Sequence, residues 1–316
     1  MEVEYRKFQP NEGLEEIQAE IYVNAQKRIP DRDYPVPTVE EVVQQIKTRN
    51  ETDAPDVNAI RYALTKDSKP LAYVQSHITN RYNATEVSFP HAMENCPTEV
   101  QDKLFQDVVD YVVDRDKDKG PDHQIIAGGI YRSKMKQEIA FLKSHNFVVN
   151  RKYLTYRYNT GSLELEGEEK FTVRKGDLTD ETDLAALMEV GRLDETALEA
   201  FPKEEQLKRY YENIQRNPLK IILVFEGDLI VAAGAIRAEE NQDPSVQLTF
   251  YRPGKESAWK LLMTKISKEA FDITQKHLSA TYEADSGTEF EMVQELEKSG
   301  HIDFVSKSYR FNLPKN

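Results

Sequence analysis

Hydrophobic and polar positions follow the same order of patterns twice along the chain. In the first half, strand-like runs at 60–64 and 71–78 flank the turn-forming stretch TKDSKP, which predicts a β-hairpin. In the second half, apolar runs at 221–225 and 229–236 flank the short turn EGD in the same way. A third strand candidate follows each hairpin, ATEVSF at 84–89 and SVQLTF at 245–250.

An amphipathic helix is predicted after the third strand of each half. Apolar residues recur with a helical period from about Thr98 and again from about Ser257. Thr98 and Gln101 resemble a capping box, which would fix the start of the first helix. The apolar stripes are Val100, Leu104, Val108 and Val112 in the first half and Ala258, Leu262, Ile266 and Ala270 in the second.

The flanking segments repeat as well. Each half opens with a strand and helical material, and each closes with a strand, a short helix and a terminal strand. We therefore interpret the chain as two copies of one β-α-α-β-β-β-α-β-α-β unit. Two unrelated α/β domains with the same coarse order are the alternative. The predicted segments are 3–8, 13–26, 38–50, 123–131, 133–147 and 151–159, then 170–176, 182–195, 203–217, 277–284, 288–302 and 306–313.

The stretch TGSLELEGEEK at 160–170 is acidic and poor in large apolar residues, which makes it the best linker candidate. A chain of 316 residues is longer than one hydrophobic core usually serves. We predict an N-terminal domain at 1–160 and a C-terminal domain at 170–316.

Charge and cysteine content narrow the functional classes. A formal net charge of -13 disfavours nucleic acid and anionic membranes as partners. Cys96 is the only cysteine, which excludes an intramolecular disulfide and favours a reducing compartment. The N-terminal residues show no signal-peptide pattern and no run is apolar enough for a membrane span, so we expect a cytoplasmic protein. The histidines are scattered, and we expect no metal site.

The turn YRPGKESAWKLL at 251–262 is the main candidate for binding chemistry. It joins the third strand of the second half to the following helix. A glycine lets a backbone approach phosphate closely, and the first amides of a helix together with the helix dipole favour an anion. Gly254 and the cations Arg252 and Lys255 therefore suggest a phosphate site. An ordinary surface turn with a Pro-Gly pair is the alternative.

The order of elements resembles the GNAT superfamily of acetyl-CoA-dependent N-acetyltransferases, in a tandem arrangement such as that of mycothiol synthase. The resemblance covers nearly the whole chain and implies an α/β (α+β) fold in which each domain is a mixed, mostly antiparallel sheet flanked by helices. It also implies acetyl-CoA as co-substrate. In the family, an Arg/Gln-x-x-Gly-x-Gly/Ala loop before the main helix holds the coenzyme A pyrophosphate.

That family loop falls on the turn at 251–262. Gly254 and Lys255 match a common Gly-Lys, Ala258 matches the final Gly/Ala, and Glu256 takes the place of the middle glycine, where its charge would oppose phosphate. In the first half Glu99 takes that place and Gln101 the last position, so we expect that copy not to bind coenzyme A in the usual way. The resemblance implies cofactor contacts from Leu248, Thr249, Phe250, Arg252, Pro253, Gly254, Lys255, Glu256, Ser257 and Ala258.

The resemblance also implies positions for an acid and a base. The family's base, a Glu on the third strand, corresponds to Gln247 in the second half and to Glu86 in the first. Because Gln cannot accept the proton, Glu283 and Asp285 after the next strand are alternatives, although solvated loop carboxylates are the simpler interpretation of both. Leu296 and Leu142 stand where the family has a Tyr that acts as the general acid. Tyr282 is the nearest substitute, and a core or edge-strand Tyr is the alternative interpretation of it.

Three functions are compatible with these residues. The first is transfer of an acetyl group from acetyl-CoA to a primary amine of a small molecule or peptide, with Glu283, Tyr282 and Glu86 as catalytic candidates. The second is a GNAT-fold binding or scaffold protein without catalysis, which Glu256 and Glu99 favour. The third is transfer of another acyl or aminoacyl group. The expected assembly is a monomer or a homodimer.

Overall fold

The computed structural model describes residues 2–9, 13–29, 36–53, 56–79, 83–160, 170–193, 204–205, 207–208, 211, 219–240, 243–285 and 287–315. The chain forms two compact units. Unit 1 comprises Met1–Arg151 and Tyr309–Asn316, and unit 2 comprises Lys152–Ser308. Residues 161–169 of the predicted linker and most of the predicted helix at 203–217 lie outside the described residues.

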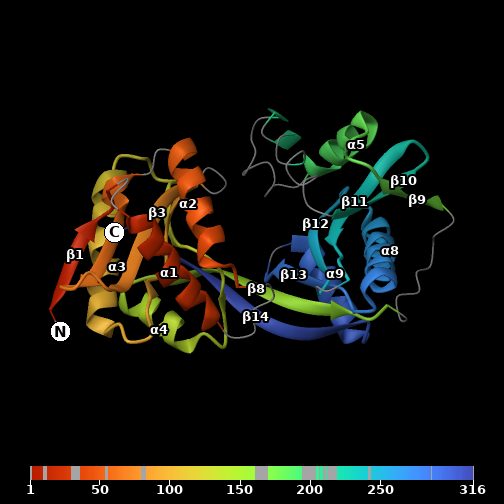
Figure 1. Ribbon diagram of the computed structural model, residues 1–316. Helices are drawn as coiled ribbons and strands as arrows, with labels where there is room; N and C mark the ends of the chain where they lie inside the picture. Colours follow the sequence, from red (N-terminus) through yellow and green to blue (C-terminus); the bar gives the residue numbers. More distant parts are fainter. Residues whose placement is uncertain are drawn as a thin grey trace. The chain divides into compact units, whose positions relative to one another are not determined.

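The first half of the chain contains the predicted elements in the predicted order, and most of them lie in unit 1 (Figure 1). The sheet of unit 1 has the order β1-β2-β3-β4-β6-β14, in which only the β4–β6 pair is parallel. The elements are β1 (Val3–Lys7), α1 (Leu14–Lys27), α2 (Val39–Asp53), a short 3₁₀ helix (Val57–Ala59), β2 (Ile60–Thr65), β3 (Pro70–Thr79), β4 (Ala84–Val87), β5 (His91–Ala92), α3 (Thr98–Asp116), β6 (Gln124–Ala127), β7 (Tyr131–Arg132), α4 (Lys136–Ser144) and β8 (Val148–Tyr158).

The main described elements of the second half follow the same order, and the sheet of unit 2 runs β9-β10-β11-β12-β13-β8 with one parallel pair, β12–β13. Both sheets are therefore mixed and mostly antiparallel, which confirms the predicted fold class. The elements are β9 (Thr172–Gly176), α5 (Glu181–Gly191), β10 (Leu219–Glu226), β11 (Leu229–Arg237), β12 (Ser245–Tyr251), α8 (Glu256–Thr274), β13 (Ser279–Glu283), α9 (Gly287–Lys298) and β14 (Ile302–Leu313).

The terminal strand of each half is divided between the units. Residues 152–158 of β8 belong to unit 2, where Tyr153 to Arg157 pair with β13. Residues 309–313 of β14 belong to unit 1, where Asn312 and Leu313 pair with β6. Each sheet is thus completed by a strand from the other half of the sequence, and neither half contains all the strands of one unit.

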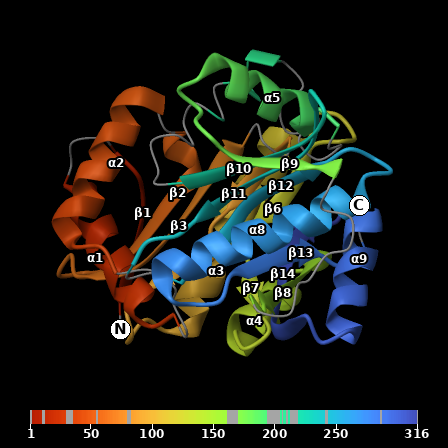
Figure 2. The ribbon, with the colours of Figure 1, turned by 90° about the vertical axis from the view of Figure 1, so that its right-hand side faces the viewer.

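The alternation of β10 distributes its side chains over two cores of unit 2. Ile222 and Val224 join a cluster with α8, whereas Ile221 and Leu223 join a cluster with α5 on the opposite face. In Figure 2, α8 runs along the strands that it covers, and it packs against β10, β11 and β12. Gly234 permits this close approach, because an added Cβ would lie 3.2 Å from a methyl of Leu262 on α8.

The start of α3 corrects one sequence prediction. Pro97 is the N-cap of α3 and no side chain caps the helix, so Thr98 and Gln101 do not form a capping box. Thr98 is already the first helical residue, and the Gln101 amide donates to the Cys96 carbonyl instead at 3.2 Å. A capping box occurs before α2. There the Glu41 N–H donates to Thr38 Oγ1 at 3.2 Å, and the Thr38 N–H donates to Glu41 Oε2 at 2.7 Å.

Candidate active site

The two parallel strands of unit 2, β12 and β13, are paired only at their first residues. β12 and β13 pair at Ser245 and Ser279 alone, where the Ser279 N–H donates to the Pro244 carbonyl at 3.0 Å. Residues 243–285 are described throughout, and no further β12–β13 residue pair forms within them. We call residues 246–251 of β12 and 280–283 of β13 the open strand ends. Beyond Ser245 and Ser279 the backbones of these two segments do not pair with each other as a continuous parallel ladder would require.

The turn at 251–256 leads from the open strand ends into α8. The Lys255 N–H donates to the Arg252 carbonyl at 3.0 Å, which closes a tight turn. Gly254 has φ of 78°, a conformation that favours glycine, and an added Cβ there would meet no atom within 4 Å. Because α8 begins at Glu256, the N–H groups of Glu256 and Ser257 have no acceptor within the helix. The backbone can therefore receive an anion here.

Carboxylates of the chain already engage this turn. The Gly254 N–H donates to Oε1 of Glu256 at 3.2 Å. The Arg252 guanidinium donates to the Ile230 carbonyl at 2.6 Å and forms an ion pair with Glu189. Lys255 forms an ion pair with Glu226, and this hydrogen bond lowers the pKa of Glu226. A phosphate at this turn would have to displace the Glu256 carboxylate from the Gly254 amide.

A carboxylate from α9 lies at the open strand ends. Oε1 of Glu289 accepts hydrogen bonds from Thr249 Oγ1 on β12 at 2.9 Å and from Trp259 Nε1 on α8 at 2.8 Å. Trp259 is fully buried, whereas Thr249 and Glu289 are half-buried. Glu289 is not among the site residues predicted from the sequence. Alternation along β12 and the single tryptophan were the available signals, but neither indicates a partner thirty or forty residues away.

Tyr282 and Glu283 lie on different faces of β13. The Tyr282 hydroxyl contacts the Tyr158 hydroxyl at 2.7 Å in the core, and burial raises the pKa of Tyr282 well above its usual value. Glu283 is the next residue of the strand and is half-buried. Asp285 is exposed in the following turn, and Gln247 donates to Ser245 Oγ at 2.9 Å. The structure therefore does not bring Tyr282 and Glu283 together as an acid–base pair.

The equivalent strands of unit 1 stay together. β4 and β6 pair continuously from Ala84–Gln124 to Val87–Ala127, and the Gly128 N–H then donates to the Val87 carbonyl at 2.7 Å. The Tyr131 hydroxyl donates to the Gly128 carbonyl at 2.8 Å. No opening like that between β12 and β13 exists over these residues, which the structure describes throughout.

Glu86 of unit 1 contacts a histidine of the neighbouring strand. Its carboxylate lies 3.5 Å from Nε2 of His77, the residue opposite it on β3. Glu86 belongs to unit 1, whereas Glu283 and Tyr282 belong to unit 2.

Cys96 is buried, and burial raises the pKa of its thiol to about 11, so it is protonated at neutral pH.

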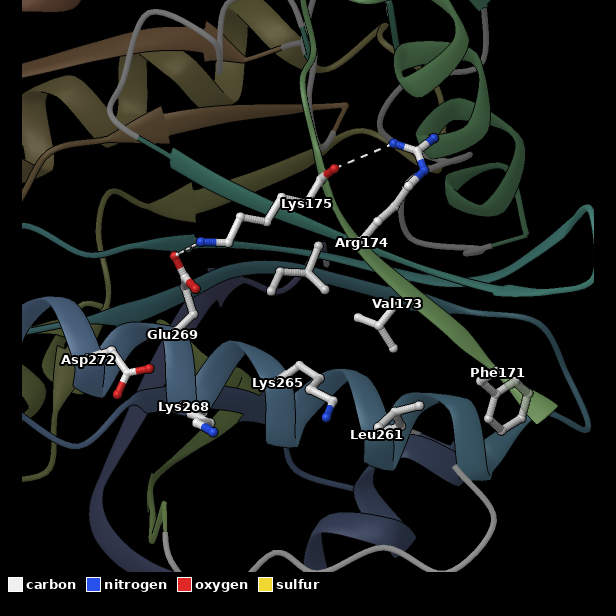
Figure 3. Close-up of a pocket in the computed structure, with 10 residues that line it drawn as sticks. Phe171, Val173, Arg174, Lys175, Leu261, Lys265, Lys268, Glu269 and Asp272 are labelled. Atoms are coloured by element: carbon white, nitrogen blue, oxygen red, sulfur yellow. Dashed lines mark hydrogen bonds and ion pairs between the residues drawn. The ribbon is translucent and has the colours of Figure 1, made fainter. Parts of the chain in front are cut away.

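A groove of about 430 Å³ lies elsewhere in unit 2, between β9 and α8. Figure 3 shows Val173 and Lys175 of β9 facing Leu261 and Glu269 of α8, and the Lys175 ammonium lies 2.6 Å from Glu269. The residues that line the groove come from β9 and the residue before it, from β10 and from α8, and none comes from β12 or β13. The groove and the open strand ends are therefore separate features.

Two classes of feature are absent from the described residues. No group of three or more His, Cys, Asp or Glu side chains could hold a metal ion there. Among the described helices, none is long and apolar enough to cross a membrane.

Solved structures with the same arrangement are known, although no sequence-family model and no curated protein sequence matches the chain. A tandem GNAT protein from the clavulanic acid biosynthesis pathway is similar over 100% of both chains, with a TM-score of 0.62 and 8% identity. A GCN5-related N-acetyltransferase from Sphaerobacter thermophilus is similar over 99% of this chain and 96% of its own, with a TM-score of 0.62 and 14% identity.

A third structure, a probable N-acyltransferase from Enterococcus faecalis, is similar over 99% of this chain and 72% of its own, with a TM-score of 0.60 and 11% identity. These similarities confirm the tandem GNAT fold that the order of elements predicts. At such identities they establish the fold and leave the activity to the residues of the site.

Proposed function

We propose that unit 2 binds acetyl-CoA and transfers its acetyl group to a primary amine of a small molecule or peptide. The observation that carries the proposal is the opening between β12 and β13, which leads directly to the Gly254 turn and the start of α8. Acyl transfer needs space for a thioester beside a site for the coenzyme's phosphates. In unit 2, the end of the β12–β13 pairing and the Gly254 turn lie along the same strand, which is where we propose the thioester and the phosphates to bind. The similarity to N-acetyltransferase structures supports the same chemistry.

The residues of the turn would hold the pyrophosphate. The N–H groups of Gly254, Glu256 and Ser257 would donate to it, and the α8 dipole would favour its charge. The amine nitrogen then attacks the thioester carbon, the C–N bond forms, the C–S bond breaks and the thiolate takes up a proton. Holding the two reactants together supplies much of the rate acceleration, so a single essential base is not required. Glu283 stays a candidate base, whereas the burial of Tyr282 disfavours it as the acid.

The two units would then differ in function. The continuous β4–β6 pairing of unit 1 leaves no such opening between these strands, which supports a structural role for this copy. On this proposal, the sequence copies at 1–160 and 170–316 arose by duplication, and only the C-terminal copy uses a coenzyme. Glu86, whose side chain is 19% exposed, would then be paired with His77 rather than act as a base.

One observation favours a second candidate function. The Glu256 carboxylate occupies the Gly254 amide, and the nearby cations Arg252 and Lys255 are paired with carboxylates. A protein that has lost its phosphate chemistry, and serves as a binding or scaffold module, would show the same contacts. A measurement of acetyl-CoA binding separates the two candidates, because a scaffold protein does not need to bind acetyl-CoA.

A transfer assay tests the proposal. The native chain is incubated with acetyl-CoA and a set of primary amines, and both free thiol and acetylated amine are measured. Gly254→Asp should lower kcat/KM about tenfold or more, since it adds charge and bulk where phosphate would bind. Gly120→Asp is the matched control, because Gly120 has φ of 80° and open space around an added Cβ in unit 1. If Gly254→Asp forms product at the native rate, the coenzyme site proposed at this turn is wrong. If the native chain forms no product with any amine, the proposed activity is wrong.

A further inference from the structure

We propose that the groove between β9 and α8, called the β9–α8 groove below, binds a medium-chain fatty acid in its carboxylate form. Its volume of about 430 Å³ lies within the range of roughly 300–1,000 Å³ that is usual for small-molecule sites. The groove belongs to unit 2 and shares no lining residue with the turn at 251–256 or with the open strand ends. The inference therefore adds a second ligand to the chain and does not rest on the proposed function.

The β9–α8 groove forms where the sheet extends past the strands that α8 covers. α8 packs against β10, β11 and β12, and β9 follows β10 as the last strand in the sheet order. Phe171 and Val173 are half-buried at the border of the core beneath α8. The groove is the space between these side chains and the flank of α8.

One end of the groove is apolar. Ile222 of β10 is 5% exposed and Leu261 of α8 is 2% exposed, and both line the groove together with Phe171 and Val173. Figure 3 shows Phe171, Val173 and Leu261 toward the same end of the groove. These side chains carry no polar group, so they favour an alkyl chain, whose methylenes leave water when they contact them.

The rest of the lining is charged, and cations are in excess. Four cations and two carboxylates line the groove, although the chain as a whole has a net charge of -13. Lys175 lies 2.6 Å from Glu269, and Arg174 is paired with Asp183 outside the groove. The lining therefore attracts an anion more than a cation. The cations are Arg174, Lys175, Lys265 and Lys268, and the carboxylates are Glu269 and Asp272.

Lys268 of α8 is the group that we assign to the ligand carboxylate. Leu261, Lys265 and Lys268 follow at helical spacing, so they share one face of α8 and the apolar residue comes first. Lys268 is exposed, and its ammonium has no hydrogen bond or ion pair with any residue that the structure describes. A carboxylate at Lys268 can direct its chain toward Leu261. Asp272 lies one turn further on, where it would repel a doubly charged phosphate more than a carboxylate.

Calorimetric titration of the whole chain with octanoate tests the inference, with no acetyl-CoA or amine present. Butanoate carries the same charge on a shorter chain, and 1-octanol carries the same chain without the charge. We expect one octanoate per chain. Octanoate should bind about tenfold or more tightly than butanoate, because its longer chain removes more methylenes from water. It should bind about fivefold more tightly than 1-octanol, which cannot pair with the lysines.

Variants at both ends of the groove locate the site. Lys268→Gln removes a charge from an exposed position and should weaken octanoate binding about threefold without changing the affinity for 1-octanol. Val173→Asp places a carboxylate at the apolar end and should weaken octanoate binding about tenfold or more. Lys298→Gln is the matched control, because it removes an exposed charge of α9 that does not line the groove, and it should bind octanoate like the native chain.

Several results would overturn the proposal. These are equal octanoate affinities of Lys268→Gln and Lys298→Gln, equal affinities of the native chain for octanoate and butanoate, and no binding at millimolar octanoate. Octanoate binding that is lost in Gly254→Asp and kept in Lys268→Gln would also overturn it, because the ligand would then occupy the turn at 251–256. If Val173→Asp does not fold, the exposed Lys268 still decides between these results.

Discussion

The equivalent parallel strands of the two units differ in how far they stay paired. In unit 1, β4 and β6 form consecutive residue pairs and continue into the Gly128 hydrogen bond. In unit 2, β12 and β13 pair at a single position and then part. The order of elements is the same in both. Side-chain and turn contacts around the strands, rather than the order of elements, therefore decide how far the two strands stay paired.

A buried ionic cluster holds the closed strands of unit 1 to α3. Asp116 ends α3, its side chain is 2% exposed, and it accepts from Arg115 at 2.7 Å and from Thr85 of β4 at 2.5 Å. Lys119 lies 2.9 Å from it, and His123, which precedes β6, lies 3.3 Å away. The cluster joins both strands to one helix end at the point where their pairing begins.

The largest effect is expected from Asp116→Asn. The variant leaves the cations of the cluster without their buried counter-charge, and the free energy of unfolding should fall by about 3–5 kcal/mol. Far-UV circular dichroism during urea unfolding follows both units, and Trp259 emission follows unit 2. The control is Asp114→Asn, whose side chain is 81% exposed and should change stability by less than about 0.5 kcal/mol. Equal losses in the free energy of unfolding of the two variants would contradict a stabilising role of the ionic cluster at Asp116.

The same carboxylate predicts a dependence on pH. Burial by itself raises the pKa of Asp116, but hydrogen bonds from Arg115, Thr85 and Lys119 outweigh it and hold the pKa well below the usual value of 3.8. A carboxyl whose pKa is lowered by folding stabilises the protein above its unfolded pKa and loses this contribution as the pH falls toward its folded pKa. The stability difference between native protein and Asp116→Asn should narrow below about pH 4. A constant difference in urea midpoint across this range would contradict the shift.

A smaller effect is expected at the hydroxyl pair of unit 2. Tyr158→Phe or Tyr282→Phe leaves the partner hydroxyl in the core without its 2.7 Å contact, at a cost of about 1–3 kcal/mol. The double variant should cost little more than either single one, because it leaves no hydroxyl unpaired. Trp259 emission during urea unfolding measures all three. Additive losses would show that the pair is not a coupled contact.

The smallest expected effect tests the turn directly. Glu256→Gly removes the carboxylate that competes for the Gly254 amide, and should tighten acetyl-CoA binding about tenfold. Glu256→Gln removes the charge alone and should give part of this gain. Glu99→Gly makes the matching change at the exposed start of α3 in unit 1, where we expect no gain. Equal gains in calorimetric affinity from Glu256→Gly and Glu99→Gly would break the distinction between the units.

The sequence predicted the elements well because each depends on local periodicity. The stripe Val100–Leu104–Val108 and the hairpin around EGD specify a helix and a turn with no knowledge of distant residues. The exchange of β8 and β14 was not predictable in this way, because alternation shows which face of a strand is buried and not which strand lies beside it. Glu289 was missed for a similar reason, since its partners come from β12 and α8. The predicted capping box at Thr98 failed because Pro97, which has no side-chain acceptor, occupies the N-cap position and Thr98 is already helical.

Calorimetric titration of the whole chain with acetyl-CoA tests the central claim most directly, because it measures affinity and stoichiometry together. The difference between the closed and the open strand pair predicts one acetyl-CoA per chain, with binding lost in Gly254→Asp and kept in Gly120→Asp. Two molecules per chain, binding that Gly254→Asp does not weaken, or no heat of binding at millimolar acetyl-CoA would contradict it.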